Sequence, residues 1–174
     1  MLVKINRNKF DELDDFALTS ACFDPLIQTY KEIRNFNGDV IQFYNDLTVG
    51  QKALFMFRTY YDHVNKSREH LYWWSAYFMV QGRWPTLKEG LIYLEDQAAP
   101  TLLEDIDEFL TKRNHPKVLG NFDFSYSNFE SDPELFLAFK TYYERYQENT
   151  PKTIERIGAY IRSHSSEFVE MIDE

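Results

Sequence analysis

The chain contains a single cysteine, Cys22, which excludes an internal disulfide and is typical of a protein from a reducing compartment. It has no apolar run of about 18 residues, the length that a transmembrane helix needs, and residues 1–10 lack the apolar core of a signal peptide. Six glycines and six prolines are few for 174 residues and favour long helices over tight turns. We therefore expect a cytoplasmic, helical protein without membrane association.

Basic residues are also in short supply, with 19 Lys and Arg against 28 Asp and Glu, a net charge of −9. Residues 121–174 carry eleven acidic and five basic groups, residues 1–50 eight and five, and residues 51–120 nine of each. An acidic surface repels phosphates, which argues against direct binding to nucleic acid or to an anionic membrane. The surface either serves solubility alone or binds a basic partner.

What the sequence has in abundance is apolar and aromatic residues, at 44% and 17%. These favour a packed globule over disorder, and apolar residues recur at the three-and-four spacing of amphipathic helices. The sequence predicts one all-α domain over residues 1–174 with about seven to nine helices. Residues 1–45 form the amino-terminal helices, and residues 46–174 form the rest of the domain.

An aromatic-rich helix pair within residues 47–84 is the predicted centre of the core. Its apolar positions at helical spacing are Ala53, Leu54, Phe57, Tyr61 and Val64 in the first helix, and Leu71, Trp74 and Phe78 in the second. All three tryptophans fall in this window, and they are also candidate anchors for an interface, because tryptophan is over-represented there. They are Trp73, Trp74 and Trp84. Aromatic surface left outside the core would favour a homodimer.

Capping residues predict where helices begin. Asp39 can cap a short helix that directly follows it. Thr48 has Gln51 at the capping-box position of the first central helix, and Ser67 can cap the second. Asp132 followed by Pro133 opens a later helix.

Four further helices and one loop are predicted from weaker signals. Thr19 or Ser20 should cap a helix over about residues 21–35, with Pro25 near its first turn, and Thr86 should cap a helix over about residues 87–97. Thr150 and Pro151 should open a new helix, and residues 167–172 should form a short terminal one. We expect residues 114–131 to be a loop that packs through Phe122, Phe124, Tyr126 and Phe129.

One polar cluster lies inside the central stretch and is the candidate site for chemistry. It comprises Asp62, His63, Asn65, Arg68, Glu69 and His70. Imidazole and carboxylate groups suit zinc, iron or manganese. In a continuous helix, however, His63 and His70 would lie about 10 Å apart along the axis, too far for one ion. The sequence also lacks a Walker loop, a dinucleotide-binding glycine motif and a nucleophile elbow. We therefore predict no catalytic residues, metal or cofactor, with a small-ligand or metal-dependent enzyme at this cluster as the alternative.

Two stretches resemble the bacterial DNA-mimic-protein-19-like domain family. Residues 47–54 followed by residues 62–65 are similar to the family's helix that ends in valine-asparagine. Residues 157–164 with Glu167 and Phe168 resemble its closing tyrosine-isoleucine-arginine-x-histidine segment. After Asn65 the chain has Lys-Ser-Arg where the family has two glycines and a phenylalanine. The resemblance implies an all-α fold and, from the member that gives the family its name, carboxylates presented like DNA phosphates to a DNA-binding regulator.

These observations favour a non-enzymatic interaction module whose acidic face engages a basic or DNA-binding protein, such as a transcription regulator. The candidate face consists of Glu130, Asp132, Glu134, Glu144, Glu148 and Glu155. A toxin-neutralising immunity protein is a third hypothesis, because small acidic chains are typical of that class.

Overall fold

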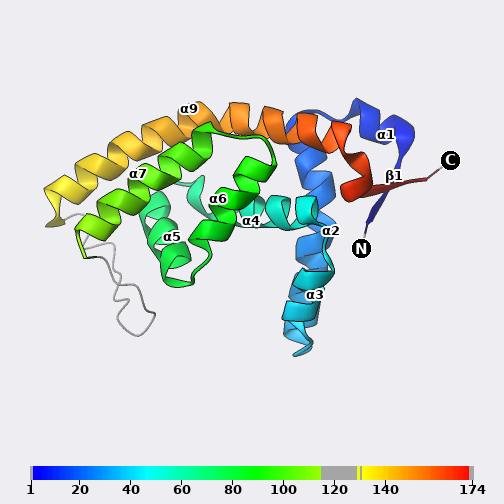
Figure 1. Cartoon of the computed structure of the whole chain (residues 1–174), viewed down its shortest axis with the longest axis horizontal. Helices are drawn as coiled ribbons and strands as arrows, with labels where there is room; N and C mark the ends of the chain where they lie inside the picture. The colour runs from blue at the N-terminus through cyan, green and yellow to red at the C-terminus, as the bar shows by residue number, and fades with distance from the viewer. Residues whose placement is uncertain (1, 115–128, 130, 173–174) are drawn as a thin grey trace.

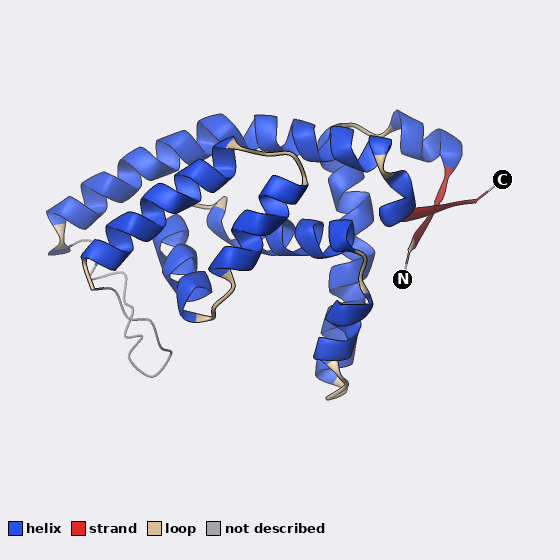
Figure 2. Cartoon of the chain, viewed as in Figure 1, coloured by secondary structure: helices blue, strands red, loops and turns tan. Residues whose placement is uncertain are grey.

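The computed structural model describes residues 2–114, 129 and 131–172 (Figure 1). Its elements are β1 (Val3–Asn6), α1 (Arg7–Glu12), α2 (Asp15–Asn35), α3 (Val40–Asp46), α4 (Val49–Val64), α5 (Arg68–Val80), α6 (Trp84–Tyr93), α7 (Ala98–Lys112), α9 (Pro133–Ser163), a 3₁₀ turn η2 (Ser165–Glu167) and β2 (Val169–Ile172). Eight α-helices lie within the described residues, and one small pair of strands joins them (Figure 2). The predicted all-α domain is confirmed.

Helix α4 lies at the centre of the fold and packs against α2, α5 and α6. Leu54 and Val64 of α4 are fully buried, as are Leu71 and Phe78 of α5. Helix α6 makes the most extensive contact with α4, because Gly90 lets the two backbones approach closely: a Cβ there would lie 3.1 Å from the Cα of Ala53. The predicted pair, α4 and α5, therefore packs together in the core, and α6 joins it as a third helix.

Helix α9 runs along the long axis of the molecule and packs against α2, α5 and α7 (Figure 1). The C-terminal half of α2 and the short α3 extend away from this body as an arm. None of the helices in the described part of the chain combines the length and the apolar character needed to cross a bilayer.

Four predicted caps are confirmed. Thr48 and Gln51 form the reciprocal capping box of α4, each side chain accepting from the other's backbone N–H at 3.1 Å. Ser67 caps α5, and Asp132 caps α9 by accepting from the Leu135 N–H at 3.0 Å. Asp39 caps α3 in the same way. Each of these oxygens satisfies a backbone donor that the first turn leaves unpaired.

The predicted start of α2 is wrong. The helix begins at Asp15 and is capped by Asp14, whose carboxylate accepts from the Ala17 N–H at 2.7 Å. The hydroxyls of Thr19 and Ser20 lie inside the helix and accept hydrogen bonds from Arg58 of α4 instead. An aspartate cap followed by an acidic first turn suits the positive end of a helix better than the later hydroxyls do.

The predicted position of Pro25 near the first turn is wrong for the same reason, since Pro25 lies in the interior of α2. The predicted helix over residues 87–97 is also misplaced, because α6 spans Trp84–Tyr93 with Pro85 in its first turn and Thr86 caps nothing. The next helix, α7, has its first amides satisfied by buried Asp96, which accepts from the Ala98 N–H at 2.8 Å.

The predicted helix start at Thr150 and Pro151 is wrong, because α9 continues through both residues. The Thr150 hydroxyl donates to the Tyr146 carbonyl at 2.6 Å, and exposed Pro151 removes one hydrogen bond on the solvent side of the helix. Water can satisfy the carbonyl of exposed Gln147, which would accept that hydrogen bond in an unbroken helix. Burial of Ile157 and Ile161 beyond the proline keeps the helix against its neighbours.

The predicted terminal helix over residues 167–172 is wrong as well. The turn η2 ends at Glu167, and β2 then pairs in parallel with β1, with Val3 opposite Val169 and Ile5 opposite Met171. Val169 is buried and Glu170 is exposed, the alternation of a half-buried strand. Local spacing cannot reveal a partner strand at the other end of the chain.

The predicted aromatic loop lies mostly outside the described residues, including Phe122, Phe124 and Tyr126. Phe129 is described and fully buried, with its ring centroid 5.4 Å from that of Tyr72. The expected packing is therefore confirmed at Phe129, but Phe129 and Ser131 are helical, so the predicted loop is wrong at these two residues.

Candidate functional site

Three carboxylates of the predicted acidic face form one stripe on α9, called here the α9 stripe: Glu144, Glu148 and Glu155. All three are exposed. Their spacing of four and seven residues places them on one helix face, about 6 and 10 Å apart along the axis. No ion pair of these three residues is found within the described part of the chain. The cations Lys140 and Lys152 are exposed on the same helix.

The other predicted members of the acidic face do not join this stripe. Asp132 and Glu134 both pair with Arg113, which follows α7, and Asp132 also caps α9. They therefore serve the contact between α7 and α9. Glu130 lies outside the described residues.

The three arginines of α9 pair with carboxylates of other elements and not with the α9 stripe. Arg145 bonds Asp105 of α7 at 2.7 Å, and Arg156 bonds Asp96 at 3.2 Å. Arg162 lies 3.4 Å from Asp15 of α2 and donates to the Leu13 carbonyl at 2.7 Å. Arg145 and Arg156, which adjoin Glu144 and Glu155 in sequence, thus hold α9 against the body, whereas Lys140 and Lys152 lie three or four residues from stripe carboxylates and share their helix face.

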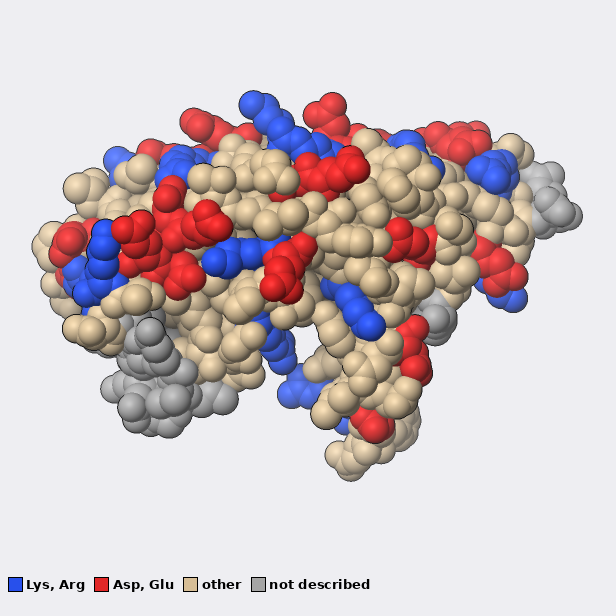
Figure 3. Space-filling view, viewed as in Figure 1, with Lys and Arg blue, Asp and Glu red and all other residues tan. Residues whose placement is uncertain are grey.

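Carboxylates also gather over α7, where Lys and Arg are interspersed with them (Figure 3). Asp107 lies 3.6 Å from Lys88, and Glu108 pairs with Lys112. This surface is therefore largely neutralised by its own ion pairs, unlike the α9 stripe.

The predicted polar cluster does not converge on one point. Asp62 lies 3.4 Å from Arg58, and the Asn65 amide donates to the Tyr61 hydroxyl at 3.0 Å. Arg68 pairs with its neighbour Glu69 at 2.8 Å and stacks over the Phe136 ring of α9 at 3.9 Å. His70 Nδ1 lies 3.0 Å from the Ser67 hydroxyl. Each side chain thus has its own partner.

His63 is held against an aromatic ring. Its imidazole stacks on Trp74 with centroids 3.6 Å apart, and burial there lowers the pKa of His63 from its ordinary value. Nowhere in the described residues do three or more His, Cys, Asp or Glu side chains come together in a way that could hold a metal ion.

The three candidate aromatic anchors separate into two groups. Trp84 is 3% exposed and packs edge-on against Tyr60 in the core, so it offers no surface to a partner. Trp73 and Trp74 are half-buried, and Trp73 stacks on Tyr77 with centroids 5.1 Å apart. A role of these two in an interface or a homodimer stays a prediction.

A polar junction that no sequence pattern predicted forms around Glu167. Its carboxylate accepts from the Gly50 N–H at 2.9 Å, from the Tyr93 hydroxyl at 3.0 Å and from the Tyr160 hydroxyl at 3.3 Å. Burial first, and the neighbouring Tyr93 and Glu167, raise the pKa of Tyr160. The negative charge lies at the amino-terminal end of α4, where the helix dipole favours it. The junction ties the end of the chain to the central helix.

Comparison of the chain with models of protein families, with curated proteins and with solved structures finds no match. The resemblance to the DNA-mimic-protein-19-like family therefore stays a prediction.

Proposed function

We propose that this chain is a cytoplasmic, non-enzymatic interaction module that binds a basic protein through the α9 stripe. One observation carries the proposal: Arg145, Arg156 and Arg162 are paired with carboxylates of neighbouring elements, whereas the three stripe carboxylates are exposed and make no ion pair within the described residues. A row of exposed carboxylates on a rigid helix attracts a partner of opposite charge and sets the orientation in which it docks.

A DNA-binding protein such as a transcription regulator is the partner class that this charge favours, because its DNA-contacting surface is rich in Lys and Arg. The resemblance to the DNA-mimic family points to the same class. Lys140 and Lys152 beside the stripe would select among basic partners by repelling misplaced cations. Since the stripe is exposed, salt should weaken the binding steeply.

The test compares three forms of the chain as bait at low salt, with bound proteins released by a salt gradient and identified by mass spectrometry. The first form is unaltered. The second carries Glu144→Gln, Glu148→Gln and Glu155→Gln. The third is a control with the same change in net charge at exposed positions elsewhere, Asp11→Asn, Glu12→Gln and Asp24→Asn.

We expect a basic protein that the unaltered chain and the control retain, that the stripe variant loses, and that elutes as salt rises. Equal retention by all three forms would overturn the proposal, as would the absence of any retained basic protein. The toxin-neutralising alternative predicts the same charge dependence, so the identity of the purified partner decides between a DNA-binding protein and a toxin.

A further inference from the structure

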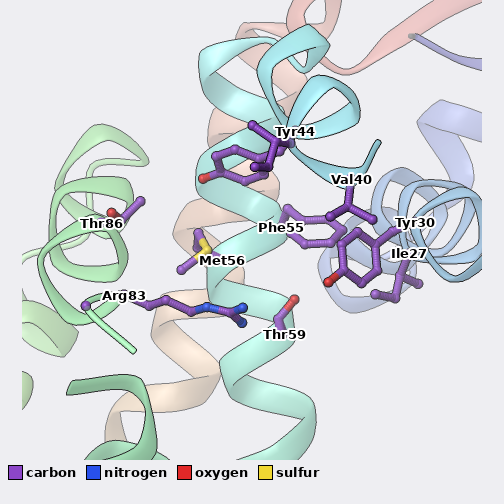
Figure 4. Close-up of a pocket in the computed structure, with 11 residues that line it drawn as sticks. Ile27, Tyr30, Val40, Tyr44, Phe55, Met56, Thr59, Arg83 and Thr86 are labelled. Carbon is purple, nitrogen blue, oxygen red and sulfur yellow. The ribbon is translucent and has the colours of Figure 1, made fainter. Parts of the chain in front are cut away.

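An open cleft separates the arm from the body of the molecule. It has a volume of about 320 Å³ and is bounded by α2, α3 and α4 and by the start of α6 (Figure 4). Figure 3 shows the corresponding hollow between the arm and the body. Its walls are mainly apolar and aromatic, and the side chains that the argument uses are Ile27, Tyr30, Val40, Tyr44, Phe55 and Met56.

One cation stands in this apolar setting. Arg83 extends across the cleft with its guanidinium directed toward Thr59 of α4 (Figure 4). Among the described residues its guanidinium makes no hydrogen bond or ion pair, and its nearest aromatic contact is the Phe78 ring at 6.0 Å. The Thr59 hydroxyl is buried and has no hydrogen-bond partner within the described part of the chain. Burial raises the pKa of Tyr44 on the opposite wall, and Arg83 counteracts that rise.

The charge of the lining is notable because the chain as a whole carries −9. Of the described residues that line the cleft, Arg83 alone is charged, and none is Asp or Glu. A guanidinium beside an unused hydroxyl binds a carboxylate through charge-assisted hydrogen bonds, while the apolar walls favour a hydrocarbon body. A single cation matches a single negative charge.

We propose that the cleft binds a small monocarboxylate with an apolar body, such as a medium-chain fatty acid, with its carboxylate on Arg83 and Thr59 and its chain against Phe55 and Val40. At the roughly 30 Å³ that one water occupies in the liquid, the cleft holds about ten non-hydrogen atoms. Octanoate has that size. This site is separate from the α9 stripe and does not depend on the proposed partner.

The test is titration calorimetry with octanoate and with the uncharged 1-octanol, together with NMR of the methyl groups of Ile27 and Val40. The variants are Arg83→Gln, which removes the cation, Val40→Trp, which fills the α3 side of the cleft, and the control Arg7→Gln, an exposed arginine on α1. Circular dichroism checks that each variant is folded.

We expect saturable one-to-one binding of octanoate, with octanol weaker by about tenfold or more, the value of a hydrogen bond to a charged group. Arg83→Gln should abolish the preference for octanoate, Val40→Trp should weaken both ligands, and Arg7→Gln should change neither. The proposal is overturned if octanoate shows no saturable binding, or if folded Arg83→Gln binds it as tightly as the unaltered chain does.

Discussion

Replacing Gly158 with alanine should destabilise the chain, although alanine is the better helix former. Gly158 lies where α9 crosses the first turn of α2, and a Cβ there would lie 2.6 Å from both the Cβ and the Cγ of Asp15. Real Cβ atoms do not approach that closely, and the Cβ of Asp15 cannot swing away as a side-chain end can. The two helices would have to separate.

The magnitude follows from two opposing effects. Overpacking a close contact costs about 1–3 kcal/mol, and replacing glycine in a helix interior returns about 1 kcal/mol. Because one of the clashing atoms is fixed to the backbone, we expect the cost to lie in the upper part of that range. Gly158→Ala should therefore lower the free energy of unfolding by about 1–2 kcal/mol, which lowers Tm by about 2–8 °C for a chain of this size.

A double-mutant cycle with Asp15→Gly isolates the clash. Asp15→Gly loses the 3.4 Å contact with Arg162 and an acidic group in the first turn of α2, but this loss is common to both arms of the cycle. With the Asp15 side chain gone, Gly158→Ala should stabilise by about 1 kcal/mol. Urea unfolding followed by circular dichroism measures all four forms. An equal effect of Gly158→Ala in the two backgrounds would refute the reasoning.

Three further predictions concern single residues. Burial against Trp74 lowers the pKa of His63, so the unfolded chain binds a proton at higher pH than the folded one. The stability that the neutral, stacked His63 contributes is therefore present above about pH 6.5 and is lost as the pH falls. An NMR titration should place the His63 midpoint below 6.5, and Trp74→Ala should raise it; an unchanged midpoint in that variant would contradict the assigned cause. Thr48→Ala should lower the free energy of unfolding by about 1–2 kcal/mol, because Thr48 caps α4 and also donates to the Glu167 carbonyl at 2.7 Å. As a control, Thr86→Ala should lower it by less than about 0.5 kcal/mol in the same urea assay. Burial raises the pKa of Cys22 to about 12, so its thiol should react with a disulfide reagent at pH 8 only in urea; rapid labelling of the folded chain would show that α2 opens.

Helix content and half of the predicted helix starts could be obtained from the sequence, because caps and apolar spacing act within a few residues. The capping box at Thr48 and the cap at Asp132 are examples. Two of the errors arose where packing overrides a local breaker, and another where the partner of a strand is distant in sequence. Pro25 and Pro151 lie inside helices whose apolar faces continue on both sides of them, and the pairing of β1 with β2 joins segments more than 160 residues apart.

The candidate site was predictable only in part. Helical spacing alone places Glu144, Glu148 and Glu155 on one face, and it could have separated them from Asp132. The arginines could not be assigned to Asp96, Asp105 or Asp15 in advance, because each pair joins different elements. The cleft at Arg83 had no local signal, since its walls come from four separate elements whose arrangement in space the spacing of residues does not reveal.

The course of α9 has a consequence for how the chain folds during synthesis. The ribosome releases α2, α5 and α7 before α9, yet each of these helices packs an apolar side against α9. Until that last long helix emerges, those surfaces face water, and the nascent chain is open to association with other chains or with chaperones. Folding should therefore finish late and cooperatively, with α9 arriving as the piece that closes the structure rather than as the one that starts it.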